Sequence, residues 1–282
     1  MREPTLDEIS TVSQRLAPFG PFIFSLAGSG EPFMRHDLID IVALLAKHHF
    51  VSLTTNGWFV TPRKARDIFK AGLRGIGVSI DYITPEKHDA QRGVDGAFAR
   101  AVQALDYLSK GRINKHQRVI IMTVLHNDNI DEIEPLIRLA AKHDAFFQTQ
   151  LYSPIKSGDK NFVIAEKVSR YLLSLKKKYK NFASNPYFLS QFDSFLKDGI
   201  SGCRAGKSFF NINTFCQASL CVEMCKKPVG NLLTDPISDI FIAMQQEYKK
   251  NVCRECWYNC RGEIEALYSL RGLYHAFIYS KT

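Results

Sequence analysis

The sequence predicts an α/β protein with a parallel sheet, followed by a smaller cysteine-rich α+β domain. Short apolar runs alternate with amphipathic helical segments at intervals of roughly 25–40 residues, which is the spacing of βα units. All seven cysteines, by contrast, lie from Cys203 onward. With 282 residues, 45% of them hydrophobic and 23% charged, the chain can fold as one large domain plus a small one.

The first half of the chain contains five expected strands separated by helices. The strands are 21–27, 50–55, 75–80, 118–125 and 146–151, and the helices are 5–17, 37–48, 62–71, 96–109 and 130–143. Thr5 and Glu8 have the spacing of a capping box at the start of the first helix. A repeating βα architecture normally opens with a strand, so we expect the first strand of the sheet to be missing from this sequence.

The pattern changes after residue 152. A stretch containing Pro, Gly and Ser predicts a loop and a boundary at 153–160. Further helices are expected at 163–178, 185–196, 237–248 and 262–279. We therefore divide the chain into an α/β core at 1–155, a helical linker at 156–200 and a cysteine-rich domain at 201–282.

Composition narrows the class of protein. No apolar run approaches the ~20 residues that a membrane-spanning helix needs. The first twenty residues also lack the apolar region of a secretory signal, so we expect a cytoplasmic protein with no membrane partner. The net charge of +9 raises a nucleic acid as a partner. However, the basic residues are spread along the chain, and the one tight run, 176–180, is typical of a solvated helix end. Charge alone does not decide, and we do not expect a nucleic-acid partner.

The cysteines predict a metal or cluster site. An odd number of cysteines in a cytoplasmic protein argues against a disulfide framework. Four of them follow the spacing C-x17-C…C-x2-C: Cys203, Cys221, Cys253 and Cys256. A C-x2-C pair places two sulfurs at one tight turn, and a distant pair can complete the site. Cys225 and Cys260 could replace or supplement a ligand, and zinc is the alternative occupant of such a sulfur set.

Small polar residues follow three consecutive expected strands. The first strand runs into 28–32 (GSGEP), the second ends in 54–57 (TTNG), and the third ends in 79–81 (SID). Ligands of parallel sheets bind outside the carboxyl ends of the strands, and a Gly-rich turn lets the backbone approach a ligand closely. We therefore expect these strand ends to form one ligand site.

Taken in order, GSGEP, TTNG, VSID and the later QRGVDGAF resemble the core of the radical S-adenosylmethionine (SAM) superfamily over about residues 1–155. The resemblance implies a (β/α)6 TIM-like barrel, here a partial one that lacks its first strand. It implies contacts with the methionyl amino group of SAM by Ser29, Gly30, Glu31 and Pro32. It also implies contacts with the ribose and carboxylate by Asn56, Ser79 and Asp81, and carboxylate pairing by Arg92.

The cysteine-rich tail, over about 200–262, is similar to the SPASM/twitch extensions of that family, which hold auxiliary [4Fe–4S] clusters. The similarity implies one cluster, because seven cysteines are too few for two fully cysteine-ligated ones. Its implied ligands are Cys203, Cys221, Cys253, Cys256 and Cys260. Cys216 stands where these extensions commonly have a turn glycine, so we expect no ligand role for it.

One departure from the family bears on activity. The family's first strand leads into a C-x3-C-x2-C loop that ligates the cluster which cleaves SAM, and no cysteine of this sequence precedes Cys203. The resemblance implies a radical SAM enzyme that modifies a peptide or small molecule with electrons from a donor such as ferredoxin or flavodoxin. As written, we expect the chain to be inactive, and a mis-called start, a split gene or a pseudoenzyme would each explain the missing loop.

Two other interpretations stay open. The chain could be a non-catalytic relative whose cluster or zinc site and barrel serve as a binding scaffold. It could also be a zinc-ribbon nucleic-acid binder that uses its positive charge. The sequence names no catalytic acid or base, and we expect His88, His126 and His143 to be structural or surface residues.

Overall fold

Five parallel strands form a curved sheet in the order β1-β2-β3-β4-β5. The computed structural model describes residues 2–27, 30–157, 161–165 and 167–279. The strands are β1 (Ile23–Leu26), β2 (Phe50–Thr55), β3 (Leu73–Ser79), β4 (Arg118–Leu125) and β5 (Phe146–Leu151). The helices of this half are α1 (Leu6–Leu16), α2 (Leu38–Leu45), α3 (Pro62–Lys70), α4 (Pro85–Arg92), α5 (Ala97–Gly111) and α6 (Ile133–Lys142). The predicted α/β fold is confirmed, and α4 is the helix that the sequence pattern missed.

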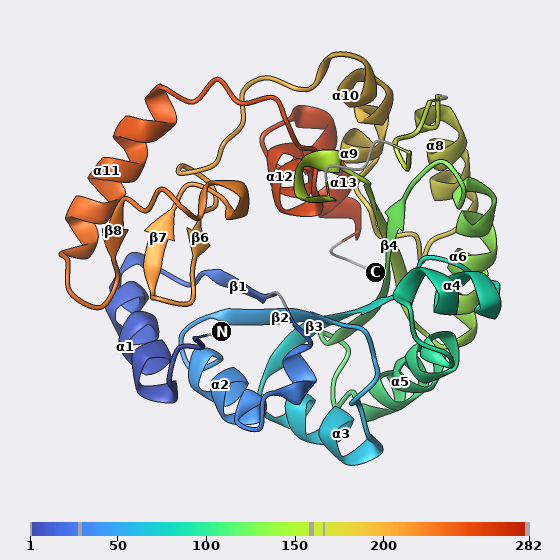
Figure 1. Cartoon of the computed structure of the whole chain (residues 1–282), viewed down its shortest axis with the longest axis horizontal. Helices are drawn as coiled ribbons and strands as arrows, with labels where there is room; N and C mark the ends of the chain where they lie inside the picture. Colours follow the sequence, from blue (N-terminus) through green and yellow to red (C-terminus); the bar gives the residue numbers. More distant parts are fainter. Residues whose placement is uncertain (1, 28–29, 158–160, 166, 280–282) are drawn as a thin grey trace.

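The sheet and its helices share one large core. Figure 1 shows α2, α3, α5 and α6 on the outer side of the curved sheet. Alternate residues of β4 are buried, including Val119 and Ile121, and they pack in the same cluster as Leu105 of α5 and Ile137 of α6. This alternation is the period-2 pattern that made the strands visible in the sequence. The core therefore holds the strand ends, and the loops that follow them, in fixed positions.

The segment 181–184 continues the sheet beyond β5. Phe147 N donates to Asn181 O at 2.8 Å, and Ala183 N donates to Phe147 O at 2.7 Å, so the pairing is parallel. We expected only a helical linker here. Its helices are α7 (Pro154–Ser157), α8 (Ser169–Lys178), α9 (Pro186–Ser190) and α10 (Phe192–Asp198), and the single helix expected at 185–196 is broken at Gln191. The pairing was invisible because four residues are too few to show a strand period.

The cysteine-rich domain contains a small antiparallel sheet and three helices in its described residues. The sheet has the order β6-β7-β8, with β6 (Asn211–Ile212), β7 (Gln217–Ser219) and β8 (Gly230–Asn231). The helices are α11 (Ile237–Lys249), α12 (Asn259–Ala266) and α13 (Leu270–Tyr279). The one long helix expected at 262–279 was wrong, since Leu267–Ser269 separate α12 from α13. No helix in the described part of the chain is both long enough and apolar enough to span a membrane.

Helix α1 lies against this C-terminal sheet. Its capping box is present as predicted, with Glu8 N donating to Thr5 Oγ1 at 3.2 Å and Thr5 N to Glu8 Oε2 at 2.8 Å. Its buried residues Val12 and Leu16 pack in one cluster with Leu232 and its neighbours. Arg15 Nη1 donates to Leu232 O at 2.8 Å. The first helix and the C-terminal domain are therefore joined by a second, smaller core.

Candidate functional site

Glu31 joins the ends of the first two strands. It caps the short 3-10 helix η2 (Pro32–Met34), and its Oε1 accepts from Phe33 N at 3.1 Å and from Thr55 Oγ1 at 2.6 Å. Its Oε2 accepts from Asn56 N at 2.7 Å. Because a carboxylate has about four acceptor positions, three of them are already used by the protein. Glu31 therefore acts mainly on the shape of these loops, with one acceptor position left for a ligand.

Asp81 and Arg92 form an ion pair at the end of β3. Arg92 Nη2 donates to Asp81 Oδ2 at 2.6 Å, and Val124 N donates to Asp81 Oδ1 at 2.8 Å. The side chain of Asp81 is 5% exposed, and that of Arg92 is 33% exposed. A guanidinium has five N–H donors, so this pairing leaves most of Arg92 free to bind a carboxylate. Asp81, in contrast, is enclosed and positions Arg92.

The other predicted residues border the same strand ends. Pro32 opens η2, and a Cβ added to Gly30 would meet no atom of the described residues within 4 Å, so the backbone there can approach a ligand. Asn56 is exposed, and its Oδ1 accepts from Trp58 N at 2.9 Å. Within the described residues, Asn56 Nδ2 and the hydroxyl of half-buried Ser79 have no hydrogen-bond partner, so both can serve a ligand. Ser29 lies outside the described residues.

A second network, at the end of β4, was not singled out by the sequence. Buried His126 contacts Asp128 through Nδ1, and its Nε2 lies 3.3 Å from Gln91 Nε2. Tyr82 OH donates to Asp128 Oδ2 at 3.1 Å. Burial, followed by the charge of Asp128, raises the pKa of Tyr82. Asn129 completes the network by donating through Nδ2 to the backbone carbonyl before Tyr82 at 3.0 Å and to that of residue 124 at 2.9 Å.

Two histidines that we expected to be structural are internal to this end of the sheet. His88 is buried and accepts from Asp81 N at 3.3 Å through Nδ1, and burial lowers its pKa. His126 lies in the network with Tyr82 and Asp128. Both histidines therefore support the loops, as expected. Only the identity of their hydrogen-bond partners, which come from distant segments, was beyond sequence reasoning.

The cysteines lie in neighbouring segments of the tail. If ionised, Cys203 and Cys253 would raise the pKa of Cys221, and Cys260 and Cys203 would raise that of Cys256. Burial is the main cause that raises the pKa of Cys203 and Cys221, and it raises that of Cys256 to about 12. Within the described residues no three Cys, His, Asp or Glu side chains are gathered closely enough to hold a metal ion. By its chemistry a set of cysteine thiolates suits iron or zinc, and the sulfurs would have to move closer together to share one site.

Cys216 has a different role. Its φ is +59°, in the left-handed region that favours glycine, and its side chain is buried in the core beside Ala218 and Leu232. A thiol that is buried in this apolar core is packed as a hydrophobic side chain, which does not favour a role as a ligand. The backbone matches the expectation that Cys216 occupies a turn-glycine position.

Arg261 holds the cysteine-bearing segments together. Its side chain is 0% exposed, and it donates to Cys256 O at 2.9 Å, Ile200 O at 2.6 Å and Glu265 Oε1 at 2.9 Å. Glu265 Oε1 in turn accepts from Arg204 N at 3.2 Å. A fully buried guanidinium is stable only when its donors are satisfied in this way. No sequence signal pointed to this role beyond an arginine near the C-x2-C pair.

The barrel and the tail meet at Asn259. Asn259 N donates to Gln150 Oε1, at the end of β5, over 3.3 Å. Its side-chain Oδ1 and Nδ2 are buried and have no hydrogen-bond partner within the described residues. Because buried amides are normally paired, this orphaned group is suited to a polar ligand group between the barrel and the cysteine segment.

Residues 1–140 match the family model of the radical SAM superfamily. A probable GTP 3′,8-cyclase of Thermoplasma volcanium is 32% identical over 155 residues, which are 54% of this chain and 46% of the relative. An AdoMet-dependent heme synthase of Methanosarcina barkeri is 26% identical over 306 residues, covering 96% of this chain and 85% of the relative. The match thus spans about half of the cyclase but most of the heme synthase.

A solved structure with the same fold is that of SuiB from Streptococcus suis bound to the precursor peptide SuiA. Its TM-score is 0.65 at 13% identity, with 85% of this chain and 58% of SuiB covered. At that identity the likeness concerns the fold. The likeness to SuiB extends beyond the barrel into the tail, because it covers 85% of the chain, and the sheet with its helices makes up a smaller share.

Proposed function

We propose that this chain, which belongs to the radical SAM superfamily, binds SAM at the carboxyl ends of β1–β3 and an iron–sulfur cluster at its C-terminal cysteines. The observation that carries this proposal is the arrangement of three consecutive strand ends. Glu31 joins the first two of them, and the Asp81–Arg92 pair lies at the third. We propose that the unpaired donors beside these contacts serve one ligand. The reaction that we propose is the radical modification of a peptide or small molecule.

The residues divide into ligand-facing and positioning groups. Arg92 would pair with the carboxylate of SAM through its remaining donors. Asn56 Nδ2 and the Ser79 hydroxyl would serve the ribose, and the open backbone at Gly30 would approach the methionyl amino group. Glu31 and Asp81 would act through their neighbours, because their oxygens are largely occupied.

At the tail we propose Cys203, Cys221, Cys253 and Cys256 as the ligands of one auxiliary [4Fe–4S] cluster, with Cys260 as a further candidate. When bound, such clusters supply electron-transfer chemistry beside the substrate. Arg261 and the Asn251 bridge would hold the ligand segments in register, since Asn251 Nδ2 donates to Cys203 O at 3.3 Å and its Oδ1 accepts from Cys253 N at 3.0 Å. Zinc remains the competing occupant of this sulfur set.

The cluster that cleaves SAM needs three soft ligands that the first 202 residues do not contain, because no cysteine precedes Cys203. We therefore propose that this chain alone binds SAM without cleaving it, and that ligands from residues outside this sequence, with an electron donor such as ferredoxin or flavodoxin, would be needed to form the 5′-deoxyadenosyl radical. The same feature of residues 1–202 favours the second candidate, a non-catalytic binding scaffold.

A peptide substrate is supported by SuiB, which was solved with its precursor peptide. A small molecule is supported by the cyclase and the heme synthase. Both classes are compatible with the orphaned amide of Asn259, which can pair with a peptide group or with another polar group at the junction.

The test begins with SAM binding to the anaerobically reconstituted chain, measured by equilibrium dialysis. R92L should lower the affinity at least tenfold, whereas the control R66L, at an exposed arginine of α3, should leave it unchanged. Equal binding by R92L and the wild type would contradict the proposed site.

A second test concerns catalysis. Fusing a segment with C-x3-C-x2-C before residue 1 should yield 5′-deoxyadenosine, which the unfused chain should not produce. If the fused chain binds SAM but forms no 5′-deoxyadenosine, the scaffold function is favoured. The metal of the tail is identified in the unfused chain. A brown unfused chain with acid-labile sulfide would support iron over zinc, and a colourless unfused chain that contains zinc would contradict the proposed cluster.

A further inference from the structure

The chain's net positive charge is concentrated at the end of the sheet opposite to the proposed SAM site. The connections that enter the strands at this end are 46–50, 70–74, 110–118, 142–146 and 177–180, here called the amino-end rim. They contain eleven Lys and Arg residues and one acidic residue, Asp144, which is a charge of +10 against +9 for the whole chain. The remainder of the chain is therefore close to neutral. Residues that are dispersed in the sequence are brought together because all five connections lead into parallel strands.

Most of these cations are not neutralised by the protein. Within the described residues, ion pairs join Lys110 to Asp106, Arg112 to Asp144 and Lys178 to Glu134. The other eight have no ion pair there: Lys47, Lys70, Arg74, Lys115, Arg118, Lys142, Lys177 and Lys180. Every one of the eight except Arg118 is exposed.

Helix dipoles account for part of this charge only. Lys70, Lys142 and Lys177 lie in the last turns of their helices, where a cation is favourable. The others lie beyond the helix ends, in loops or at the starts of strands: Lys47, Arg74, Lys115, Arg118 and Lys180. The charges of this second group repel one another without an ion pair among the described residues to offset the repulsion, which is the condition expected of a surface that binds a polyanion.

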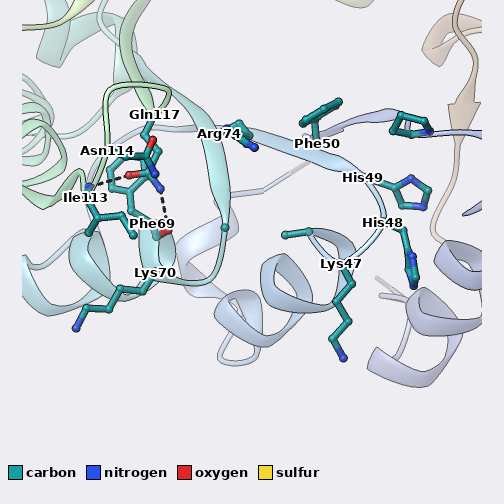
Figure 2. A pocket seen from close by; sticks show the side chains of 13 residues that line it. Lys47, His48, His49, Phe50, Phe69, Lys70, Arg74, Ile113, Asn114 and Gln117 are labelled. Atoms are coloured by element: carbon teal, nitrogen blue, oxygen red, sulfur yellow. Dashed lines mark hydrogen bonds between the residues drawn. The ribbon is translucent and has the colours of Figure 1, made fainter.

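The amino-end rim is also hollowed. A cavity of about 400 Å³ lies among the connections before β1, β2, β3 and β4, and none of the described residues that line it is acidic. Figure 2 shows Lys47 and Lys70 in the lower part of the view, where their side chains diverge, with Phe50 and Arg74 above them. Phe50 is 45% exposed, and the guanidinium of Arg74 lies 5.5 Å from the centre of its ring. The cavity therefore combines free cations with an accessible aromatic ring.

We infer that the amino-end rim is a binding surface for single-stranded nucleic acid. Proteins that bind single strands combine a positive groove along the phosphates with aromatic rings on which bases stack, and both features are present here. An acidic protein fits less well, because lysine is depleted from protein interfaces and their centres are apolar. An anionic membrane surface would require an apolar insertion beside the charges, and among the described residues the exposed large apolar side chains of this cavity are Phe50 and Ile113 alone.

This surface is independent of the proposed SAM site. The two lie at opposite ends of the same parallel strands, and no described residue belongs to both. A nucleic acid held here would be a partner that recruits or localises the chain, and its binding needs neither SAM nor a cluster.

The experiment measures fluorescence anisotropy of a labelled 20-nucleotide oligo(U) with the full chain at 50, 100 and 200 mM salt. With four to eight phosphate contacts, the plot of log K against log salt should have a slope of about −3 to −6. The rim variant K70E/R74E/K115E should lose at least about tenfold in affinity at 100 mM salt and about 2 units of that slope. The control K167E/R170E/K197E carries the same net charge at exposed positions outside the rim and should bind within about twofold of the wild type.

Phe50 separates stacking from charge. F50L should lower the affinity about tenfold and leave the salt slope unchanged, because stacking contributes without phosphate contact. The inference is overturned if the wild type does not bind at 50 mM salt, or if the rim and control variants lose affinity equally. It is also overturned if polyglutamate of equal charge competes as well as oligo(U), which would indicate an acidic protein. Tighter binding to vesicles of anionic lipid than to oligo(U) would overturn it in favour of a membrane.

Discussion

The two ends of the parallel sheet use charge in opposite ways. At the carboxyl ends, the connections 27–37, 80–84 and 126–132 contain six acidic residues and one arginine, and Glu31, Asp81 and Asp128 all accept hydrogen bonds from neighbouring loops. The amino-end rim contains eleven Lys and Arg residues and one acidic residue. Eight of these Lys and Arg residues have no ion pair within the described residues. At the carboxyl ends, the charged side chains position the loops of the proposed site. At the amino-end rim, the charged side chains remain available to a partner.

This difference follows from what each end has to hold. A small ligand needs loops fixed to within a fraction of an ångström, which buried ion pairs and charge-assisted hydrogen bonds provide. A flexible polyanion needs only a dense field of cations, and exposed lysines provide it without fixed geometry. Substitutions should therefore affect stability at the carboxyl ends and in the tail, but binding alone at the amino-end rim.

The largest effect is expected for Arg261, the buried cation that ties the cysteine-bearing segments together. R261M should lower the free energy of unfolding by about 3–5 kcal/mol, because it removes the donor shared by several partly buried backbone carbonyls and leaves Glu265 without its counterion. Chemical denaturation followed by circular dichroism would measure the change.

The control for this substitution is R170M, at an exposed arginine of α8. It removes the same charge from a position without an ion pair in the described part of the chain, so it should change the free energy of unfolding by less than about 0.5 kcal/mol. Equal destabilisation by R261M and R170M would contradict the organising role of Arg261.

The next effect is expected at Glu31. E31Q should lower the free energy of unfolding by about 2–3 kcal/mol, because its amide group would present a donor to a backbone N–H or to the Thr55 hydroxyl, where an acceptor is needed. It should also weaken SAM binding, since the first two strand ends lose their shared acceptor. The matched control is E86Q, at an exposed glutamate of α4, which should change neither quantity. Unchanged stability in E31Q would show that the carboxyl-end loops are held by packing alone.

A smaller effect, which depends on pH, is expected at Glu263 in α12. Glu263 accepts from Asn185 N at 3.0 Å, and burial raises its pKa from 4.5 to about 7, although this hydrogen bond and then the charge of Lys176 oppose the shift. The folded chain therefore keeps a proton that the unfolded chain releases, so the free energy of unfolding should fall as the pH rises from about 4.5 to about 7. At about 1.4 kcal/mol per pH unit, the loss attributable to Glu263 is at most about 3 kcal/mol.

Denaturation of wild type and E263Q at pH 5, 6 and 7 would measure this contribution. The glutamine cannot ionise, so the wild type should lose stability relative to E263Q at each step of the series. Parallel curves for the two proteins would mean that Glu263 has an ordinary pKa.

Much of the fold was predictable because it rests on local periodicity. The strands at 50–55, 118–125 and 146–151 begin and end as expected, since each alternates buried residues with more exposed ones along its length. The capping box of α1 was predictable for the same reason, because Thr5 and Glu8 are three residues apart. The break between α12 and α13 was missed, since no Pro or Gly marks Leu267–Ser269.

The candidate site was predictable only in part. The motifs pointed to Glu31, Asp81 and Arg92, but not to the pairing of the last two or to the network at the end of β4, whose members come from separate strand ends. The amino-end rim was missed for the same physical reason. Its cations are dispersed in the sequence, and only the parallel topology brings their connections to one end of the sheet.

The smallest effect on stability is expected at the amino-end rim, and it is the sharpest test of the difference between the two ends. Lys115 is exposed, lies beyond the end of α5 and has no ion pair within the described residues, so K115E should change the free energy of unfolding by less than about 0.5 kcal/mol. If it changes at all, stability should rise, because one charge in a field of like charges is reversed. Denaturation at low and high salt would measure this, since salt should reduce the difference between K115E and the wild type. A loss of more than about 1 kcal/mol would show that these cations have a structural use, and the contrast between the two ends would no longer hold.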